Sequence, residues 1–171
     1  PMKKGMYEFL ENKISPEHSV LDFGCSGGVI TCWLSKQCKS VVGVDCESSR
    51  IEYGKKINTN DNVFLVCDDG KDLMNSGKYS FDVLVCAHVL EHLDNPEELL
   101  INAKRHFRYI YIEVPDFESS YLNISKSLLG VGINYTDSDH VHEFDREELE
   151  KQIMNLDMKI LDAEFRYGVR K

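Results

Sequence analysis

The 171-residue sequence lacks a long apolar run, and this absence bears on where the protein works. No stretch approaches the roughly 18 apolar residues that a membrane-spanning helix requires. The first residues, Pro1 to Met6, also lack the apolar core of a secretory signal peptide. We therefore expect a cytoplasmic protein without a membrane span.

Basic residues are also scarce. Lys and Arg number 20 against 29 Asp and Glu, which gives a formal net charge of −9. Because binding to a phosphate backbone draws on clustered Lys and Arg, this balance argues against a nucleic-acid partner. The one dense basic group, Lys104 to Arg108, falls at the predicted end of a helix, where cations stabilise the helix dipole.

Closely paired cysteines are absent as well. The chain has six cysteines, but no two are spaced as C-x-x-C, the spacing typical of zinc sites and redox-active disulfides. We expect free thiols in a reducing compartment, acting as small apolar residues, and we expect no metal site. The six are Cys25, Cys32, Cys38, Cys46, Cys67 and Cys86.

Strand-like and helix-like patterns alternate along the chain, with no internal repeat or low-complexity tract. Short apolar, β-branched runs at residues 20–23, 40–45, 63–67, 81–87 and 109–114 predict buried strands, and segments of helical periodicity separate them. The alternation predicts one α/β domain over residues 1–171, with a doubly wound, mostly parallel sheet and helices on both faces. A further run at residues 158–165 predicts a sixth strand.

The first strand runs into a glycine-rich turn, in the sequence VLDFGCSGG of residues 20–28, and a helix is expected from Val29 to about Gln37. Gly24, Gly27 and Gly28 can take positive φ, and the following helix start offers unpaired N–H groups, so a nucleotide-like ligand can approach the backbone. The dinucleotide fingerprint G-x-G-x-x-G is not met. Starting from Asp22, the pattern is D-x-G-x-S-x-G.

That pattern resembles motif I, [DE]-x-G-x-G-x-G, of the class I S-adenosylmethionine-dependent methyltransferases, with Ser26 in place of the middle glycine. The segment from Phe81 to Leu93 is similar to the family's fourth strand and short helix, with its F-D start and L-E-H-L end. The likeness covers about residues 18–165 and is to small domains of types 11 and 12. It implies a Rossmann-like methyltransferase fold and S-adenosyl-L-methionine as the cofactor. The family's sheet has seven strands, one more than this chain offers, so we expect the last hairpin to be shortened, missing or built differently.

The resemblance implies cofactor-binding residues at the carboxyl ends of the strands. Asp45 lies 21 residues after Gly24, near the ~20 expected for a carboxylate that binds ribose hydroxyls. Asp68, with Asp69 as the alternative, aligns with the acid that contacts the adenine amino group; an acidic turn that only solvates a loop is the competing interpretation. The expected set is Asp22, Gly24, Ser26, Gly28, Asp45, Cys46, Asp68, Asp69, Cys86 and Ala87.

The segment around the fourth strand has a rival interpretation. Residues 88–92, HVLEH, satisfy H-x-x-E-H, the zinc motif of one metalloprotease group. That motif needs a long helix to turn both imidazoles toward one metal. A strand-like run precedes His88 and Asp94-Asn95-Pro96 follows His92, so a zinc hydrolase is the weaker hypothesis.

The second half of the chain carries the candidate acceptor-binding residues. Asn95 caps a helix that begins at Pro96, and the fifth strand ends at Pro115. Residues 116–144 are long and irregular, and we expect them to cover the pocket and select the acceptor. Near their end, DHVHEF at residues 139–144 is similar to a histidine-and-phenylalanine segment of the family, and a capped helix follows from Asp145 to about Asn155.

The resemblance implies transfer of a methyl group to an acceptor, most simply a small molecule, a sugar or a glycan. Such a transfer depends on alignment of the acceptor atom, and needs a base only if that atom must lose a proton. His140, His142 and His88, in that order, are the candidate catalytic residues, with acceptor binding or bracing of the loop as the alternative. A non-catalytic S-adenosylmethionine-binding or regulatory protein is the second hypothesis. A partner or a missing segment could complete the pocket.

Overall fold

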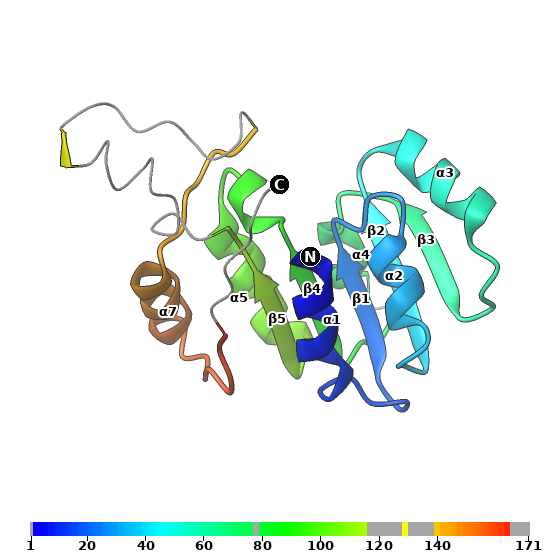
Figure 1. Cartoon of the computed structure of the whole chain (residues 1–171), viewed down its shortest axis with the longest axis horizontal. Coiled ribbons are helices and arrows are strands. Elements are labelled where there is room, and N and C mark those ends of the chain that lie inside the picture. The colour runs from blue at the N-terminus through cyan, green and yellow to red at the C-terminus, as the bar shows by residue number, and fades with distance from the viewer. Residues whose placement is uncertain (1, 77–78, 116–127, 130–138, 165–171) are drawn as a thin grey trace.

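The computed structural model describes residues 2–76, 79–115, 128–129 and 139–164. Its centre is a five-stranded, all-parallel sheet in the order β3-β2-β1-β4-β5 (Figure 1). The strands are β1 (Ser19–Phe23), β2 (Ser40–Asp45), β3 (Val63–Cys67), β4 (Val83–Ala87) and β5 (Tyr109–Glu113). Strand order reverses between β1 and β4, and ligands of such sheets bind at this point, at the carboxyl ends of the strands. The predicted doubly wound sheet is confirmed.

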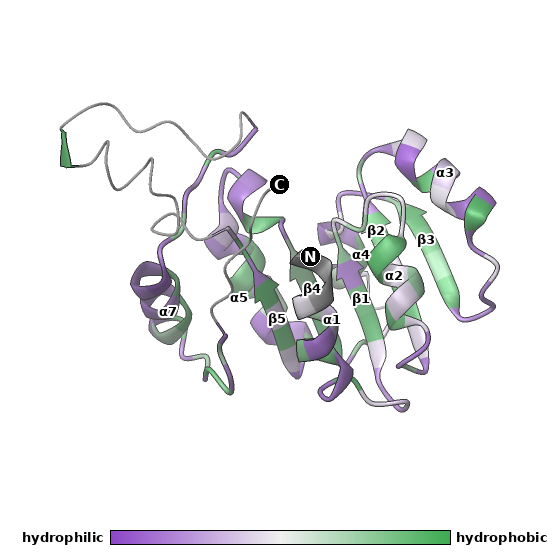
Figure 2. Ribbon diagram, viewed as in Figure 1, coloured by the Kyte–Doolittle hydropathy of each residue, from purple (hydrophilic) through white to green (hydrophobic). Residues whose placement is uncertain are grey.

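Helices lie on both faces of the sheet because successive strand residues point to opposite sides. Val20 of β1 packs with Met6 and Leu10, whereas Leu21 packs with Leu99. Figure 1 shows α1 and α2 in front of the sheet, and Figure 2 shows the apolar residues concentrated in the strands between the two layers. The helices are α1 (Met2–Glu11), α2 (Val29–Leu34), α3 (Ser48–Ile57), α4 (Lys71–Asn75), the 3₁₀ turn η1 (Leu90–His92), α5 (Pro96–His106) and α7 (Arg146–Asn155).

Side-chain caps fix the starts of the two helices for which the sequence predicts them. The Asn95 side chain accepts a hydrogen bond from the Glu98 amide at 3.3 Å, with Pro96 at the first helical position. The Asp145 carboxylate accepts one from the Glu148 amide at 2.7 Å. Each cap satisfies a backbone donor that has no partner within its own helix.

The helix after the glycine turn is shorter than predicted. It ends at Leu34, and the chain continues to Gln37 in tighter turns, in which the Gln37 amide donates to the Leu34 carbonyl at 2.8 Å. Bonds between residues three apart are a common way to end a helix. The side-chain pattern is nearly the same for both conformations, so the sequence does not separate them.

The predicted sixth strand is wrong for the residues described. Residues 158–164 pair with no strand of the sheet, and Leu161 is 67% exposed. Asp157 turns the chain with a φ of 52°, and Lys13 Nζ, in the turn after α1, binds Asp162 Oδ2 at 2.6 Å. The apolar alternation is local, whereas a strand also needs a neighbour with free backbone groups. This segment instead lies against the chain that follows α1.

The six cysteines all lie in the described part of the chain, and all six are free thiols, as predicted. Burial raises the pKa of the Cys38 thiol to about 11 and also raises that of Cys86, so these thiols stay protonated at neutral pH. Among the helices that the structure describes, none combines the length and the apolar character needed to cross a membrane.

Candidate cofactor and acceptor site

The turn between β1 and α2 takes a left-handed backbone at Gly24 and Gly28, as the glycine pattern predicts, but not at Gly27, for which the same prediction was wrong. Gly24, Ser26 and Gly28 have φ values of 73°, 52° and 76°. Ser26 therefore has a left-handed backbone although it is not a glycine, at a cost of about 1–2 kcal/mol for a residue with a Cβ. Two contacts offset this cost: Ser26 N donates to Asp45 Oδ2 at 2.8 Å, and Arg50 Nη1 donates to Ser26 Oγ at 2.9 Å.

Gly24 also lies too close to the next element for any side chain. A Cβ at this position would stand 2.5 Å from Cγ2 of Val89, the residue before η1. The glycine turn therefore packs directly against the segment that follows β4. This contact places the L-E-H-L segment beside the turn.

Asp22 is buried rather than directed into an open crevice. It is 1% exposed, and its Oδ2 accepts a hydrogen bond from Thr31 Oγ1 at 2.6 Å. Burial raises the pKa of Asp22 to about 7, with a smaller rise from the charge of Asp45, although the Thr31 hydrogen bond opposes it. Asp22 thus joins β1 to α2. Its cofactor contact stays a prediction.

Asp45 ends β2 with its carboxylate directed to the glycine turn. Oδ2 accepts from Ser26 N at 2.8 Å and Oδ1 accepts from Glu47 N at 2.9 Å. Each carboxylate oxygen has a second lone pair, so Asp45 can still accept from two ribose hydroxyls. Cys46 follows it and is exposed.

The two acids after β3 have different surroundings. Asp69 is exposed, and its Oδ1 accepts from the amides of Lys71 and Asp72 at 3.0 and 3.4 Å, at the start of α4. Asp68 is half-buried and accepts from Gly70 N at 2.8 Å through Oδ1 alone. In both residues the hydrogen bonds to described residues use Oδ1 alone, so the choice between Asp68 and Asp69 as the residue that contacts a base stays a prediction.

His88, directly after β4, lies between two carboxylates. Its Nε2 is 3.5 Å from Glu113 Oε1 and its Nδ1 is 3.3 Å from Glu91 Oε1. Glu113 first, and Glu91 next, raise the pKa of His88 to about 9 despite its partial burial. His88 is therefore protonated at neutral pH, which argues against its role as a general base. The neighbouring Cys86 and Ala87 are buried in the strand.

The other two candidate histidines are fixed near η1 by backbone bonds. The amides of Val141 and His142 both donate to the Glu91 carbonyl, at 2.9 and 3.1 Å. His142 Nε2 is 3.2 Å from the Asp94 carbonyl, whereas His140 Nδ1 is 3.4 Å from Glu143 Oε1. The structure thus brings His88 and His140 to the side chain of Glu91 and ties His142 to Asp94. Of the expected lid, residues 116–127 and 130–138 lie outside the described residues.

Glu91 and Thr31 are the site residues that the sequence pattern did not single out. Glu91 belongs to the L-E-H-L pattern, but the sequence does not distinguish a buried glutamate from an exposed one. Only the folded structure shows that Glu91 is 1% exposed. The H-x-x-E-H motif is not built as a metalloprotease helix. His88 directly follows β4 with a φ of 57°, and η1 contains only three residues. The zinc-hydrolase hypothesis loses its structural basis here.

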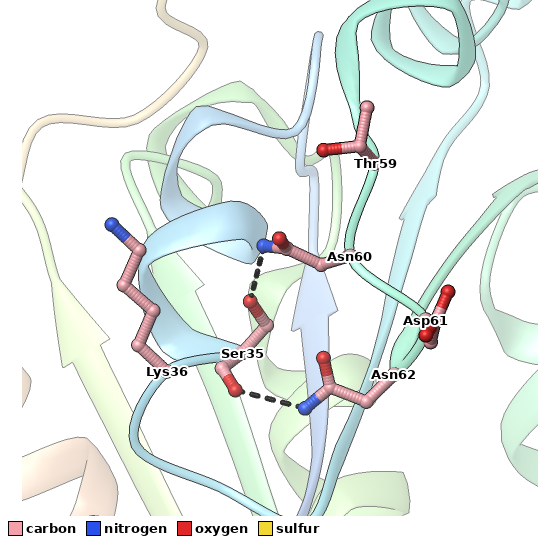
Figure 3. A pocket seen from close by; sticks show the side chains of 6 residues that line it. All are labelled: Ser35, Lys36, Thr59, Asn60, Asp61 and Asn62. Carbon is pink, nitrogen blue, oxygen red and sulfur yellow. Dashed lines mark hydrogen bonds between the residues drawn. The ribbon is translucent and has the colours of Figure 1, made fainter.

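A separate groove lies at the opposite end of the sheet (Figure 3). Its side chains hold the chain together, because Asn60 Nδ2 donates to Ser35 Oγ and Asn62 Nδ2 to the Ser35 carbonyl, both at 2.8 Å. The groove adjoins the amino end of β3, away from the glycine turn and the histidines. It is lined by Ser35, Lys36, Thr59, Asn60, Asp61 and Asn62.

The sheet, the positive-φ turn and the acids at the strand ends define a nucleotide-cofactor-binding α/β domain. The model of the methyltransferase domain family matches residues 21–109, just over half of the chain. The chain belongs to this family, the S-adenosylmethionine-dependent methyltransferases.

Curated relatives and solved structures agree with this family. The ubiquinone biosynthesis O-methyltransferase of Rickettsia conorii is 30% identical over 110 residues, which cover 60% of this chain and 35% of the relative. A SAM dependent methyltransferase from Archaeoglobus fulgidus has a TM-score of 0.68 at 23% identity, over 91% of this chain and 67% of that chain. The plantazolicin methyltransferase BamL, solved in complex with a triazolic desmethylPZN analog and SAH, has a TM-score of 0.66 at 19% identity, over 91% and 60%. The match to the curated relative spans about a third of its length.

Proposed function

We propose that this domain transfers the methyl group of S-adenosylmethionine to an oxygen atom of a small-molecule acceptor. The observation that carries the proposal is the turn of Gly24, Ser26 and Gly28, with three positive φ values and with Asp45 bound to its centre. The name of the curated relative, a ubiquinone biosynthesis O-methyltransferase, supports an oxygen acceptor on a small molecule. Nothing comparable supports a sugar or a glycan.

The residues present fit the cofactor. Asp45 would bind the ribose hydroxyls, and Asp68 the adenine amino group through Oδ2. The backbone of the glycine turn and the end of β4 would hold the remainder. When bound, S-adenosylmethionine supplies a methyl group already activated on sulfur; the new C–O bond forms as the C–S bond breaks, and the electron pair of that bond stays on sulfur. The protein then has to align the acceptor oxygen with the C–S bond and exclude water.

An acceptor hydroxyl must also lose its proton. His88 is held as a cation and is poorly suited to accept it. The Nδ1 of His140 lies 3.4 Å from Glu143 Oε1, and His140 stays the first candidate for the base. His142 stays the second candidate.

Calorimetric titration of the protein with S-adenosylmethionine, S-adenosylhomocysteine and NAD tests the cofactor. We expect binding of the first two only, and a loss of at least tenfold, about 1.4 kcal/mol, in Asp45→Asn. Asp61→Asn is the matched control, because Asp61 is an exposed acid in the groove at the opposite end of the sheet. Binding of NAD, or equal affinity in Asp45→Asn, would contradict the proposed site.

Acceptor transfer is measured separately, as S-adenosylhomocysteine formed with small phenols and with oligosaccharides. Turnover with a phenol supports the proposed acceptor class. Turnover with an oligosaccharide alone would refute it. Cofactor binding without turnover on either would favour the non-catalytic, S-adenosylmethionine-binding alternative.

A further inference from the structure

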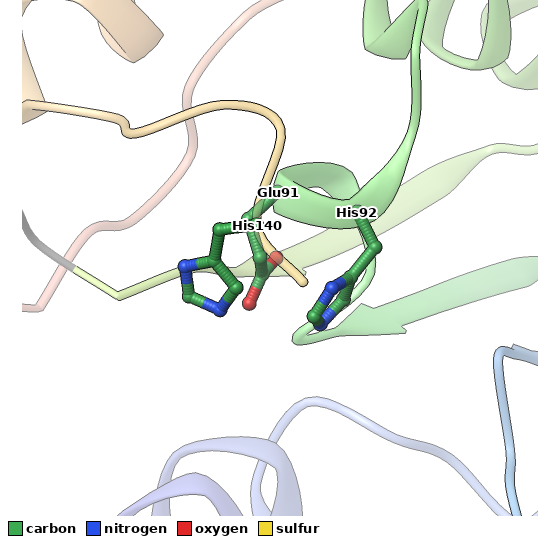
Figure 4. Close-up of side chains that lie close together, drawn as sticks. All are labelled: Glu91, His92 and His140. Atoms are coloured by element: carbon green, nitrogen blue, oxygen red, sulfur yellow. The ribbon is translucent and has the colours of Figure 1, made fainter. Parts of the chain in front are cut away.

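Glu91, His92 and His140 form a cluster in which one ligand atom of each residue lies within 4.8 Å of the others (Figure 4). Glu91 and His92 belong to η1, and His140 is brought to them by the amides of the next two residues, which bind the Glu91 carbonyl. In Figure 4 the carboxylate of Glu91 lies between the two imidazoles. The cluster combines side chains nearly 50 residues apart in the sequence.

The carboxylate of Glu91 is the observation that points to a ligand. Glu91 is 1% exposed, and neither of its oxygens receives a hydrogen bond from the described residues. His88 Nδ1 stands 3.3 Å from Oε1 as an ion pair, but Oε2 has no such neighbour within the described ranges. Buried carboxylates are normally hydrogen-bonded, paired or bound to a metal, because burial without compensation is costly.

In both imidazoles, Nδ1 lies close to an oxygen atom that orients the ring. His92 Nδ1 is 3.1 Å from the Asp139 carbonyl, and His140 Nδ1 is 3.4 Å from Glu143 Oε1. An Nδ1–H that donates to such an oxygen leaves Nε2 with its lone pair, which is the usual arrangement of a metal-binding histidine. The rings meet edge to face, with their centroids 4.9 Å apart.

We propose that Glu91, His92 and His140 bind a divalent first-row metal ion, with zinc as the first candidate. Two imidazole nitrogens and one carboxylate oxygen suit such ions, whereas Mg²⁺ and Ca²⁺ favour oxygen ligands alone. This set differs from the H-x-x-E-H pair of the metalloprotease motif, because His140 takes part and His88 does not. It departs from the absence of a metal expected from the cysteine spacing.

Three protein ligands leave a tetrahedral ion with an open position. The segment that carries Glu91 packs on the glycine turn through Val89, whose Cγ2 would stand 2.5 Å from a Cβ on Gly24. The open position would take an oxygen atom of the methyl acceptor, and His140, as a metal ligand, would then not act as the base; this part of the inference rests on the proposed function. Binding of the ion itself does not.

Titration of tag-free, chelator-treated protein with Co²⁺ and Zn²⁺ tests the proposal, with visible absorption of bound Co²⁺ and metal analysis after dialysis as readouts. We expect one equivalent of metal per chain, and affinity at least ~100-fold weaker in Glu91→Gln and in His140→Ala. His142→Ala is the matched control: His142 lies on the same segment but is tied to the Asp94 carbonyl, so its metal content should be unchanged. Circular dichroism of each variant establishes that it is folded.

Substoichiometric metal in the wild type would overturn the proposal. So would equal affinity in folded Glu91→Gln or His140→Ala, or loss of metal in His142→Ala. A parallel titration with S-adenosylhomocysteine separates the two proposals. If the protein binds S-adenosylhomocysteine but no metal ion, only the proposed metal site is refuted. If it binds the metal ion but no S-adenosylhomocysteine, only the proposed methyltransferase site is refuted.

Discussion

Replacing Gly24 by alanine should destabilise the protein through two separate effects at one atom. The residue has a φ of 73°, which costs a residue with a Cβ about 1–2 kcal/mol. The new methyl group would also stand 2.5 Å from Val89 Cγ2, and Val89 is 7% exposed, so it has little room to move. Overpacking of this kind costs about 1–3 kcal/mol. We therefore expect the free energy of unfolding to fall by about 3 kcal/mol.

Gly27→Ala, three residues further along the same turn, is the matched control. Its Cβ would meet Tyr53 Cδ1 at 3.5 Å, which is ordinary contact with a side chain that is 60% exposed. With no positive φ to maintain, this variant should equal the wild type or gain about 0.4–1 kcal/mol from a less flexible unfolded chain. Urea unfolding, followed by the fluorescence of Trp33 in the adjoining α2, measures both. Equal stabilities of the two variants would refute the reasoning.

Three further predictions concern polar side chains. Burial holds the pKa of Asp22 at about 7, above its ordinary value near 4, so its contribution to stability falls as the pH rises through this range. Asp22→Asn cannot ionise, so its free energy of unfolding, measured in urea, should rise relative to that of the wild type by up to about 4 kcal/mol from pH 4 to pH 8. The same difference between the two proteins at both pH values would contradict the raised pKa. Thr31→Val removes the hydroxyl that donates to Asp22 and should cost about 1.5–3 kcal/mol at pH 8; a loss below 0.5 kcal/mol by the same assay would show the bond to be unimportant. Asn95→Ala should cost about 1 kcal/mol, seen as a lower midpoint of thermal unfolding, while Asn95→Asp, which can still cap, should cost little.

The local elements of this fold could be predicted because their causes are local. The apolar runs that became β2 and β3 match the observed strands at both ends. Burial explains the run of β2, whose inner residues are all buried, whereas β3 lies at the edge of the sheet and exposes Phe64. The helix starts at Asn95 and Asp145 follow from side chains that reach only three residues ahead. Family motifs added the expected place of the cofactor.

Features that depend on a distant partner could not be predicted. Residues 158–164 carry a strand-like pattern, but their place beside Lys13 depends on a contact across most of the chain. The burial of Glu91 has no signature in the letters L-E-H-L, because it arises from packing of η1 under the segment of His140. The shifted pKa of His88 likewise depends on Glu113 of the neighbouring strand.

The backbone bonds from Val141 and His142 to the Glu91 carbonyl bear on how this domain can change over evolution. On the other side, the His88 amide donates to the Glu113 carbonyl at 2.8 Å, so the chain is fixed at both ends of the stretch between residues 113 and 141. Once both ends of a connecting segment are held, doubling its length costs only about 0.6 kcal/mol of closure entropy. We therefore expect insertions between residues 113 and 141 to leave the sheet and the glycine turn folded. The same sheet could then carry connecting segments of different length between β5 and α7, without a change in the rest of the fold.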